Sequence, residues 1–164
     1  MGLSHLAAVV ASAAIALAFV AVRGFLCERG DGWLSAVGLG FVVIGSTLYA
    51  TLPGMEFSVV AAHATGADLV ATQDALVSWF VPVLLGGSLL FTVGTVLFAV
   101  AVTRTATFGL LATAVVGGAL VVFGLARLVP VGVVQFYVQS AAALLALLPL
   151  AVAIGAGRRG APTR

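Results

Sequence analysis

Lysine and asparagine are absent from the 164 residues, and cysteine occurs once, as Cys27. One thiol cannot form a disulfide within the chain, and no second cysteine is present with which to build a metal knuckle or a redox pair. The lack of asparagine removes every acceptor for N-glycosylation. Alanine, valine, leucine, glycine and arginine are abundant instead, which is typical of GC-rich coding sequence and predicts a prokaryotic source.

Charged residues are also scarce. They make up 7% of the chain, while hydrophobic residues make up 63% and the mean hydropathy is +1.29. An average globular protein is about half apolar and about one quarter charged, so a water-soluble fold could not cover this much apolar surface. The isoelectric point is near 9.3, but the arginines are dispersed and only Arg158 and Arg159 are adjacent, so there is no basic face for nucleic acid.

Catalytic and cofactor motifs are missing as well. The sequence contains no His-Glu-x-x-His, no Gly-x-Ser-x-Gly, no Cys-x-x-Cys and no glycine-rich phosphate loop. The five acidic residues all fall outside the apolar stretches, which disfavours a proton pump or an ion-coupled transporter. We therefore predict no catalytic residue and no cofactor.

Five long apolar stretches predict an all-α integral membrane bundle that forms one domain over residues 1–164. The expected transmembrane helices cover residues 3–22, 33–52, 78–102, 107–128 and 131–156. Pro53 and Gly54 are expected to end the second helix, which makes 54–77 an outer loop and 157–164 a cytoplasmic tail. Apolar residues between Leu69 and Phe80 recur at helical spacing, so the second half of that loop is expected to be an interfacial helix.

The arginines predict the orientation of the helices. With the amino terminus outside and the carboxyl terminus inside, Arg127 is the one arginine on the outer side. The other six lie on the cytoplasmic side: Arg23, Arg29, Arg104, Arg158, Arg159 and Arg164. Positive residues concentrate on the cytoplasmic side of membrane proteins, so we expect a multi-pass protein of a prokaryotic cytoplasmic membrane.

Glycines two helical turns apart are expected where helices approach closely. Three such pairs occur: Gly38 with Gly45, Gly87 with Gly94, and Gly117 with Gly124. The adjacent glycines at 86–87 and 117–118 are also compatible with a hinge or a substrate path, although that interpretation requires polar residues on the same faces.

Arg127 is the one charged residue inside an expected span, where a guanidinium costs about 2.5 to 3.5 kcal/mol. One interpretation is that it snorkels to the headgroups. The other is an outer-facing polar pocket for an anion, a lipid headgroup or a small solute. That pocket would join Arg127 to Gln135, Gln139, Tyr49 and Ser46, and the loop acids Glu56, Asp68 and Asp74 are candidates to neutralise the arginine.

His5 and His63 both fall on the expected outer side, where imidazoles could ligate a metal or haem. A histidine in a loop and another near a terminus are more often solvated, and haem binding in membranes generally uses histidines inside facing helices. Both interpretations remain open.

The segment from Pro82 to Gly155 contains the run GGSLLFTVGTVLFAVAVTRTATFGLLATAVVGGALVVFGLARLVP. It resembles uncharacterised small polytopic membrane proteins of high-GC prokaryotes in its composition, in the single arginine of its short inner loop and in the proline after the next helix. The resemblance implies a helical bundle and brings no activity and no site residues.

Three functions remain compatible with the sequence. The first is a non-enzymatic structural or accessory subunit, or a binder of a small apolar or lipid-like ligand. The second is a small permease or exporter subunit with an outer-facing polar pocket. The third is a membrane enzyme or metal or haem protein that uses His63, Glu56 and Asp68. The expected partners are membrane lipid and either a second copy of the chain or a larger membrane complex.

Overall fold

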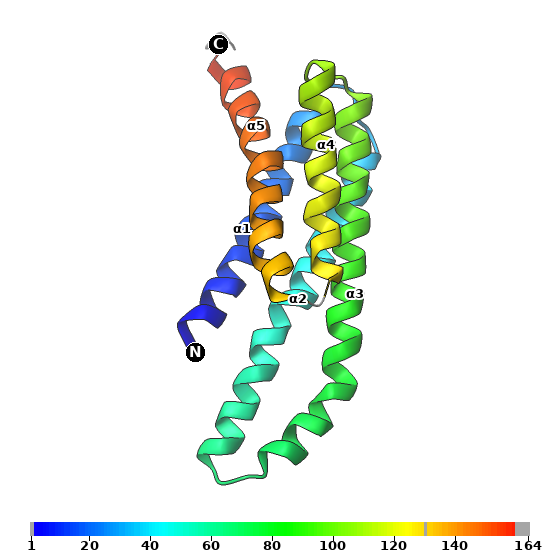
Figure 1. Ribbon diagram of the computed structural model, residues 1–164. Helices are drawn as coiled ribbons and strands as arrows, with labels where there is room; N and C mark the ends of the chain where they lie inside the picture. Colours follow the sequence, from blue (N-terminus) through cyan, green and yellow to red (C-terminus); the bar gives the residue numbers. More distant parts are fainter. Residues whose placement is uncertain (1, 130, 160–164) are drawn as a thin grey trace.

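The structure is a computed structural model that describes residues 2–129 and 131–159. The described chain is helical and contains no strand (Figure 1). Its long helices are α1 (Gly2–Cys27), α2 (Leu34–Ala64), α3 (Leu69–Arg104), α4 (Leu110–Leu125) and α5 (Gln139–Arg159). A short 3-10 turn, η1 (Ala126–Leu128), follows α4, and a π-helical segment, η2 (Val134–Val138), leads into α5.

Five helical spans are long and apolar enough to cross a bilayer, as the sequence predicts. They cover His5–Cys27, Leu34–Ala64, Leu69–Arg104, Leu110–Leu128 and Val134–Gly157. Large apolar side chains also cover the outside of the bundle; Leu110, for example, is 90% exposed. A surface of this kind is favourable in lipid and unfavourable in water, which supports a multi-pass membrane protein.

The expected end of the second helix at Pro53 and Gly54 is wrong, and so is the outer loop over 54–77. Helix α2 continues through both residues to Ala64, α3 begins at Leu69, and only 65–68 connects them. A proline removes one backbone donor and crowds the preceding turn, but helices packed against neighbours in a membrane tolerate it. Pro53 is buried in the bundle, and Pro82 and Pro149 also lie inside helices.

The turn between α2 and α3 contains residues that end one helix and cap the next. Gly66 adopts a φ of +78°, which suits glycine at the end of a helix. Asp68 then caps α3, because its carboxylate accepts hydrogen bonds from the backbone N–H groups of Val70 (2.9 Å) and Ala71 (3.2 Å). The helix expected from the spacing between Leu69 and Phe80 is present, as the first three turns of α3.

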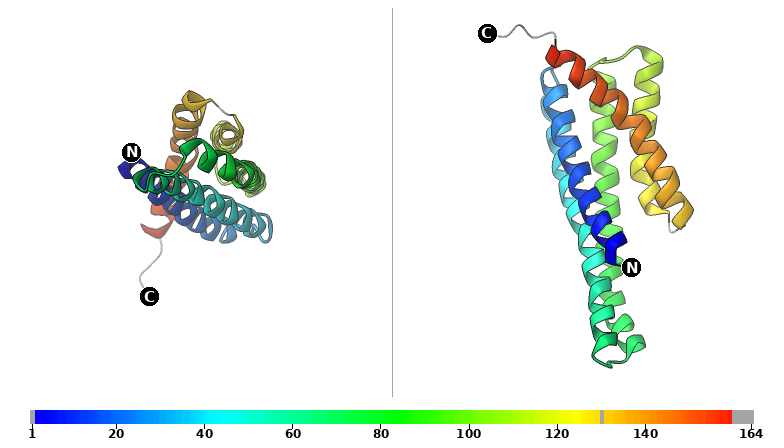
Figure 2. Two further views of the ribbon diagram at one scale, coloured as in Figure 1. Left: turned by 90° about the horizontal axis from the view of Figure 1, so that it is seen from below. Right: turned by 90° about the vertical axis from the view of Figure 1, so that its left-hand side faces the viewer.

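Helix lengths set the shape of the molecule. Helix α3 has 36 residues and α2 has 31, which correspond to about 54 and 46 Å. The fourth span has 19 residues, about 28 Å, which matches the hydrocarbon thickness of about 30 Å. The α2–α3 hairpin therefore extends well beyond α4 and α5 at one end of the bundle (Figures 1 and 2).

Two contacts between backbones hold α2 against α3. A Cβ added at Gly45 would lie 2.6 Å from the backbone nitrogen of Phe91, and one added at Gly94 would lie 2.8 Å from the carbonyl oxygen of Gly38. Between α3 and α4, the hydroxyl of Thr92 donates to the carbonyl oxygen of Gly124 (2.9 Å). Close packing at these glycines is thus confirmed, whereas a Cβ at Gly117 would make only ordinary contacts.

Four phenylalanines fill the centre of the bundle between α1, α3 and α4. Phe19, Phe91, Phe98 and Phe123 are all at most 1% exposed. The Phe91 and Phe123 rings meet edge to face at 5.1 Å, and those of Phe19 and Phe98 lie 4.7 Å apart. Such ring pairs add to the free energy gained from burial alone.

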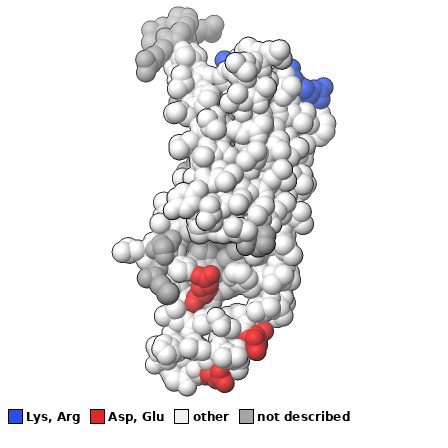
Figure 3. All heavy atoms as spheres, viewed as in Figure 1, with Lys and Arg blue, Asp and Glu red and all other residues white. Residues whose placement is uncertain are grey.

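The two ends of the molecule differ in charge on one face. On the face that Figure 3 shows, arginine side chains lie at one end and acidic side chains at the opposite end. The α1–α2 and α3–α4 connections and the end of α5 form the first end, which we call the arginine end (Figure 1). The tip of the α2–α3 hairpin forms the other, the hairpin end. Arg164 lies outside the described residues.

Candidate functional site

Arg127 does not snorkel out of the bundle. It lies in η1, immediately after α4, and only 3% of its surface is exposed. The snorkelling interpretation is therefore wrong for this side chain. A 3-10 turn tightens the end of a helix, and here it carries the guanidinium inward, toward α2 and α3.

Two aromatic rings hold the guanidinium. Its Cζ lies 3.5 Å from the ring centroid of Phe91 on α3 and 4.7 Å from that of Tyr49 on α2. A cation over the face of an aromatic ring gains about 0.5 to 2 kcal/mol, and the larger values apply where water is excluded. Sequence reasoning missed Phe91, because nothing in the sequence distinguishes it from the other phenylalanines of the spans.

The two predicted glutamines also reach Arg127. With the amide of Gln139 oriented to satisfy both of its neighbours, its oxygen accepts from Nε of Arg127 at 2.7 Å, and its nitrogen donates to the Gln135 carbonyl at 2.8 Å. The side chain of Gln135 donates to the carbonyl oxygen of Arg127 at 3.4 Å, a long contact. Both glutamines belong to the region of η2, and π-helical turns of this kind occur often at functional sites.

Within the described residues no carboxylate forms an ion pair with Arg127, and Glu56 pairs with His5 instead. The expectation that Glu56, Asp68 or Asp74 would neutralise Arg127 is therefore wrong. Asp68 caps α3, and Asp74 lies on the hairpin, which continues as helix and carries both acids away from Arg127.

One donor of Arg127 has no partner. Nη1 is buried and makes no hydrogen bond. A buried donor left unpaired costs about 1 to 3 kcal/mol, and more when it is charged. The aromatic rings and Gln139 offset part of the cost of burying the charge, but they leave this group unsatisfied.

A cavity of about 350 Å³ opens beside the guanidinium between α1, α2, η1 and α5. We call it the Arg127 cavity. Its wall includes Ala8, Ala11, Tyr49, Arg127, Gln135 and Gln139. The α1 side of the wall is mostly alanine, and short side chains leave space that a leucine would fill.

A second cavity of about 490 Å³, the His5 cavity, continues toward the hairpin end. It shares Ala8, Tyr49, Gln135 and Phe136 with the Arg127 cavity, so the two cavities adjoin, and we call them together the groove. Helices α1 and α5 diverge toward the amino-terminal end of α1 (Figures 1 and 2). Residues of α1 and of η2, which leads into α5, line both cavities. The His5–Glu56 pair lies on its wall.

Four of the five predicted site residues therefore meet around one cavity: Arg127, Gln135, Gln139 and Tyr49. Ser46 is buried one turn before Tyr49, its hydroxyl has no partner, and it does not line the cavity. Ligand binding by these residues remains a prediction.

The two histidines occupy different surroundings. His5 pairs with Glu56 and contacts the ring of Phe57 at 5.4 Å, whereas His63 is exposed two turns farther along α2. Within the described chain, no three histidine, cysteine or acidic side chains are grouped so that they could hold a metal ion. Metal ligation by His5 and His63 remains a prediction.

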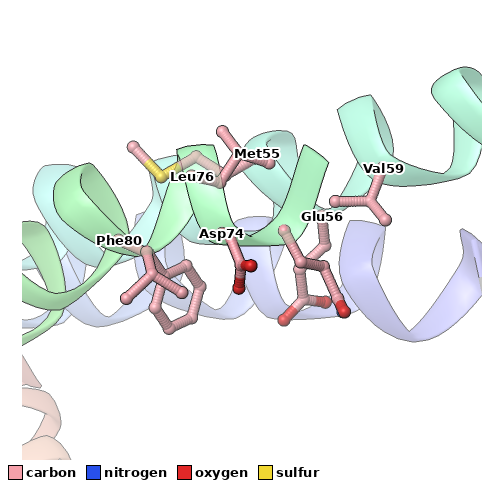
Figure 4. Close-up of a pocket in the computed structure, with 8 residues that line it drawn as sticks. Met55, Glu56, Val59, Asp74, Leu76 and Phe80 are labelled. Atoms are coloured by element: carbon pink, nitrogen blue, oxygen red, sulfur yellow. The ribbon is translucent and has the colours of Figure 1, made fainter. Parts of the chain in front are cut away.

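A third cavity, of about 400 Å³, lies within the hairpin between α2 and α3. Glu56 from α2 and Asp74 from α3 project their carboxylates to the same side of it, next to Phe80 (Figure 4). The sequence could not predict this cleft while 54–77 was expected to be a loop.

Comparison of the chain with protein-family models, with curated proteins and with solved structures found no match.

Proposed function

We propose that this chain is a non-enzymatic integral membrane protein that binds a small lipid-like ligand in the Arg127 cavity. The observation that carries the proposal is the buried guanidinium of Arg127, which has one unpaired donor and no carboxylate partner among the described residues, in a residue that lines a cavity with mainly apolar walls. Pockets for small molecules are typically apolar and contain a few polar groups that fix the ligand's orientation. The Arg127 cavity has this composition.

The opening of the groove favours a ligand that comes from the bilayer. Both cavities lie along the seam between α1 and the η2–α5 segment, two segments on which apolar side chains such as Leu6 and Tyr137 are exposed. An amphiphile can enter there sideways without crossing a water-filled path. The alanines of α1 leave room for an alkyl chain along this seam.

The orientation is part of the proposal. We infer that the arginine end faces the cytoplasm and the hairpin end faces outward, across a prokaryotic cytoplasmic membrane. The arginine end holds Arg23, Arg29 and Arg104, together with the acids Glu28 and Asp31 in the α1–α2 connection. The orientation rule depends on positive residues and gives little weight to acids, so these two acids do not reverse it.

A permease or exporter subunit is the second candidate. The two adjoining cavities, which extend from Arg127 toward the hairpin end, favour it. Transport also needs a way onward to the arginine end, and there the phenylalanines Phe19, Phe98 and Phe123 fill the bundle almost without exposure. Binding explains the groove without a second conformation. An accessory role in a homo-oligomer or larger complex is compatible with either candidate.

Native mass spectrometry from lipid nanodiscs tests the proposal. We expect the wild-type protein to retain a bound amphiphile. Ala11→Leu, which places a larger side chain in the cavity wall, should lower its occupancy about fivefold or more, because one or two methylene clashes cost about 1 to 3 kcal/mol. Ala13→Leu is the matched control, since Ala13 is exposed on another face of α1. Equal retention in all three proteins, or no retention in the wild type, would contradict the proposal.

A further inference from the structure

We infer that the group held at Arg127 is a single oxyanion, such as a carboxylate or a phosphate diester oxygen, attached to an apolar chain that leaves the cavity between α1 and α5. This inference rests on the proposed function and specifies the chemistry of the ligand. It follows from the charge at the site, from the hydrogen-bonding groups that are still free there, and from the shape of the groove.

The charge at the site is uncompensated. A guanidinium remains charged inside proteins, and Arg127 is 3% exposed and forms no ion pair within the described part of the chain. Charge interactions are strong where water is excluded. One negative charge balances one guanidinium, so a monoanion fits the site better than a dianion or a cation.

The free hydrogen-bonding groups are donors. Nε of Arg127 is paired with Gln139, while Nη1 has no partner. The two serine hydroxyls on the cavity wall already donate to backbone carbonyls, Ser12 to Ala8 and Ser140 to Phe136, and the Tyr49 hydroxyl on the same wall is a further group that can donate to a ligand. The ligand must therefore supply an acceptor, which a carboxylate or phosphate oxygen does and an ammonium group cannot do.

The ring of Phe91 limits how a ligand can approach Arg127. Phe91 lies against one face of the guanidinium at 3.5 Å, so an anion cannot sit over that face. We expect a ligand oxygen to approach in the plane of the guanidinium, along its N–H bonds, which is the direction from which arginine binds oxyanions most strongly. The apolar part of the ligand then extends along Ala8, Ala11 and Phe136 into the seam between α1 and α5.

The test compares two amphiphiles with the same chain. Radiolabelled dodecanoate and dodecanol are bound at pH 8 to the protein in nanodiscs of zwitterionic phosphatidylcholine, and sodium acetate and inorganic phosphate are tested alone. We expect dodecanoate to bind about tenfold or more tightly than dodecanol, because a charged hydrogen bond is lost in the alcohol. Acetate and phosphate should bind far more weakly than dodecanoate, because they lack the chain.

Variants separate the contribution of the charge from that of the cavity. Arg127→Gln should bring the affinity for dodecanoate to that for dodecanol, whereas Arg104→Gln, at the arginine end, should leave both affinities unchanged. Ala11→Leu should weaken both amphiphiles. The comparison of the two amphiphiles in the wild-type protein needs no variant. It therefore tests whether the site prefers an oxyanion even if Arg127→Gln does not fold.

Each remaining outcome contradicts a stated part of the account. Equal wild-type affinities that Ala11→Leu lowers would overturn the oxyanion inference and leave the proposed function standing. Binding of acetate or phosphate as tight as that of dodecanoate, and dependent on Arg127, would support an oxyanion from solution and overturn the lipid-like ligand. If none of the four probes binds, both the inference and the proposed function fail.

Discussion

The guanidinium of Arg127 lies 3.5 Å from the ring centroid of Phe91. The arginine is held in η1 after α4, and the phenylalanine lies on α3, one residue before the threonine that bonds to Gly124. This contact links a charged side chain that is only 3% exposed to the aromatic centre of the bundle.

A double-mutant cycle measures that contact. We expect Phe91→Leu and Arg127→Met to show a coupling free energy of about 1 to 2 kcal/mol, because the cation and the ring attract each other where water is excluded. The measurement is reversible unfolding in mixed micelles. Phe98→Leu is the matched control, because Phe98 is equally buried and does not contact Arg127. Its coupling to Arg127→Met should stay within about 0.5 kcal/mol, and equal coupling for both phenylalanines would refute the assignment.

The contact between α2 and α3 gives a second prediction. Gly45→Ala should destabilise the protein by about 1 to 3 kcal/mol, because the new Cβ would lie 2.6 Å from the backbone of Phe91 and the helices must separate. Thermal unfolding in detergent measures the change. Gly40→Ala is the control, since a Cβ there meets nothing within 4 Å; it should be neutral or stabilise by up to about 1 kcal/mol. Equal effects at the two positions would show that α2 and α3 do not approach closely at Gly45.

The cap of α3 gives a third prediction. Asp68→Ala removes the acceptor for the N–H groups of Val70 and Ala71, which costs about 0.5 to 2 kcal/mol. Amide hydrogen exchange over residues 69–73 should then become about 2- to 30-fold faster. Asp74→Ala should leave exchange in that turn nearly unchanged, because Asp74 makes no capping bond. Unchanged exchange in Asp68→Ala would argue that 54–77 behaves as the loop that the sequence first suggests.

Much of the fold could be predicted from the sequence, because hydropathy and glycine spacing report local requirements. A helix that crosses a bilayer needs a long apolar stretch, and each of the five expected stretches lies largely within a helical span, although the second span ends later and the third begins earlier than expected. The glycines at 38, 45, 87 and 94 were predictable because only a missing side chain permits backbones to approach so closely. The end of α2 could not be predicted, since the effect of Pro53 depends on its burial against neighbouring helices.

Only part of the candidate site could be predicted from the sequence. Arg127, Gln135 and Gln139 could be joined because they stand near one hairpin in the sequence. Phe91 could not, since its contact depends on how α3 packs beside η1. The expected neutralising acids failed for a related reason: Ala64, at the end of α2, is 15 residues beyond Tyr49, about 22 Å along a continuous helix. The hairpin that bears Asp68 and Asp74 extends away from the arginine.

The central claim is that five helices cross the membrane with the arginine end in the cytoplasm. Maleimide labelling in intact cells tests this claim. Cys27 is exposed at the arginine end, and Ala64 lies at the hairpin end. An impermeant maleimide should leave Cys27 unlabelled until the cells are lysed, while Ala64→Cys in a Cys27→Ser background should react at once. Labelling of Cys27 in intact cells, with protection of the cysteine at position 64, would contradict the account.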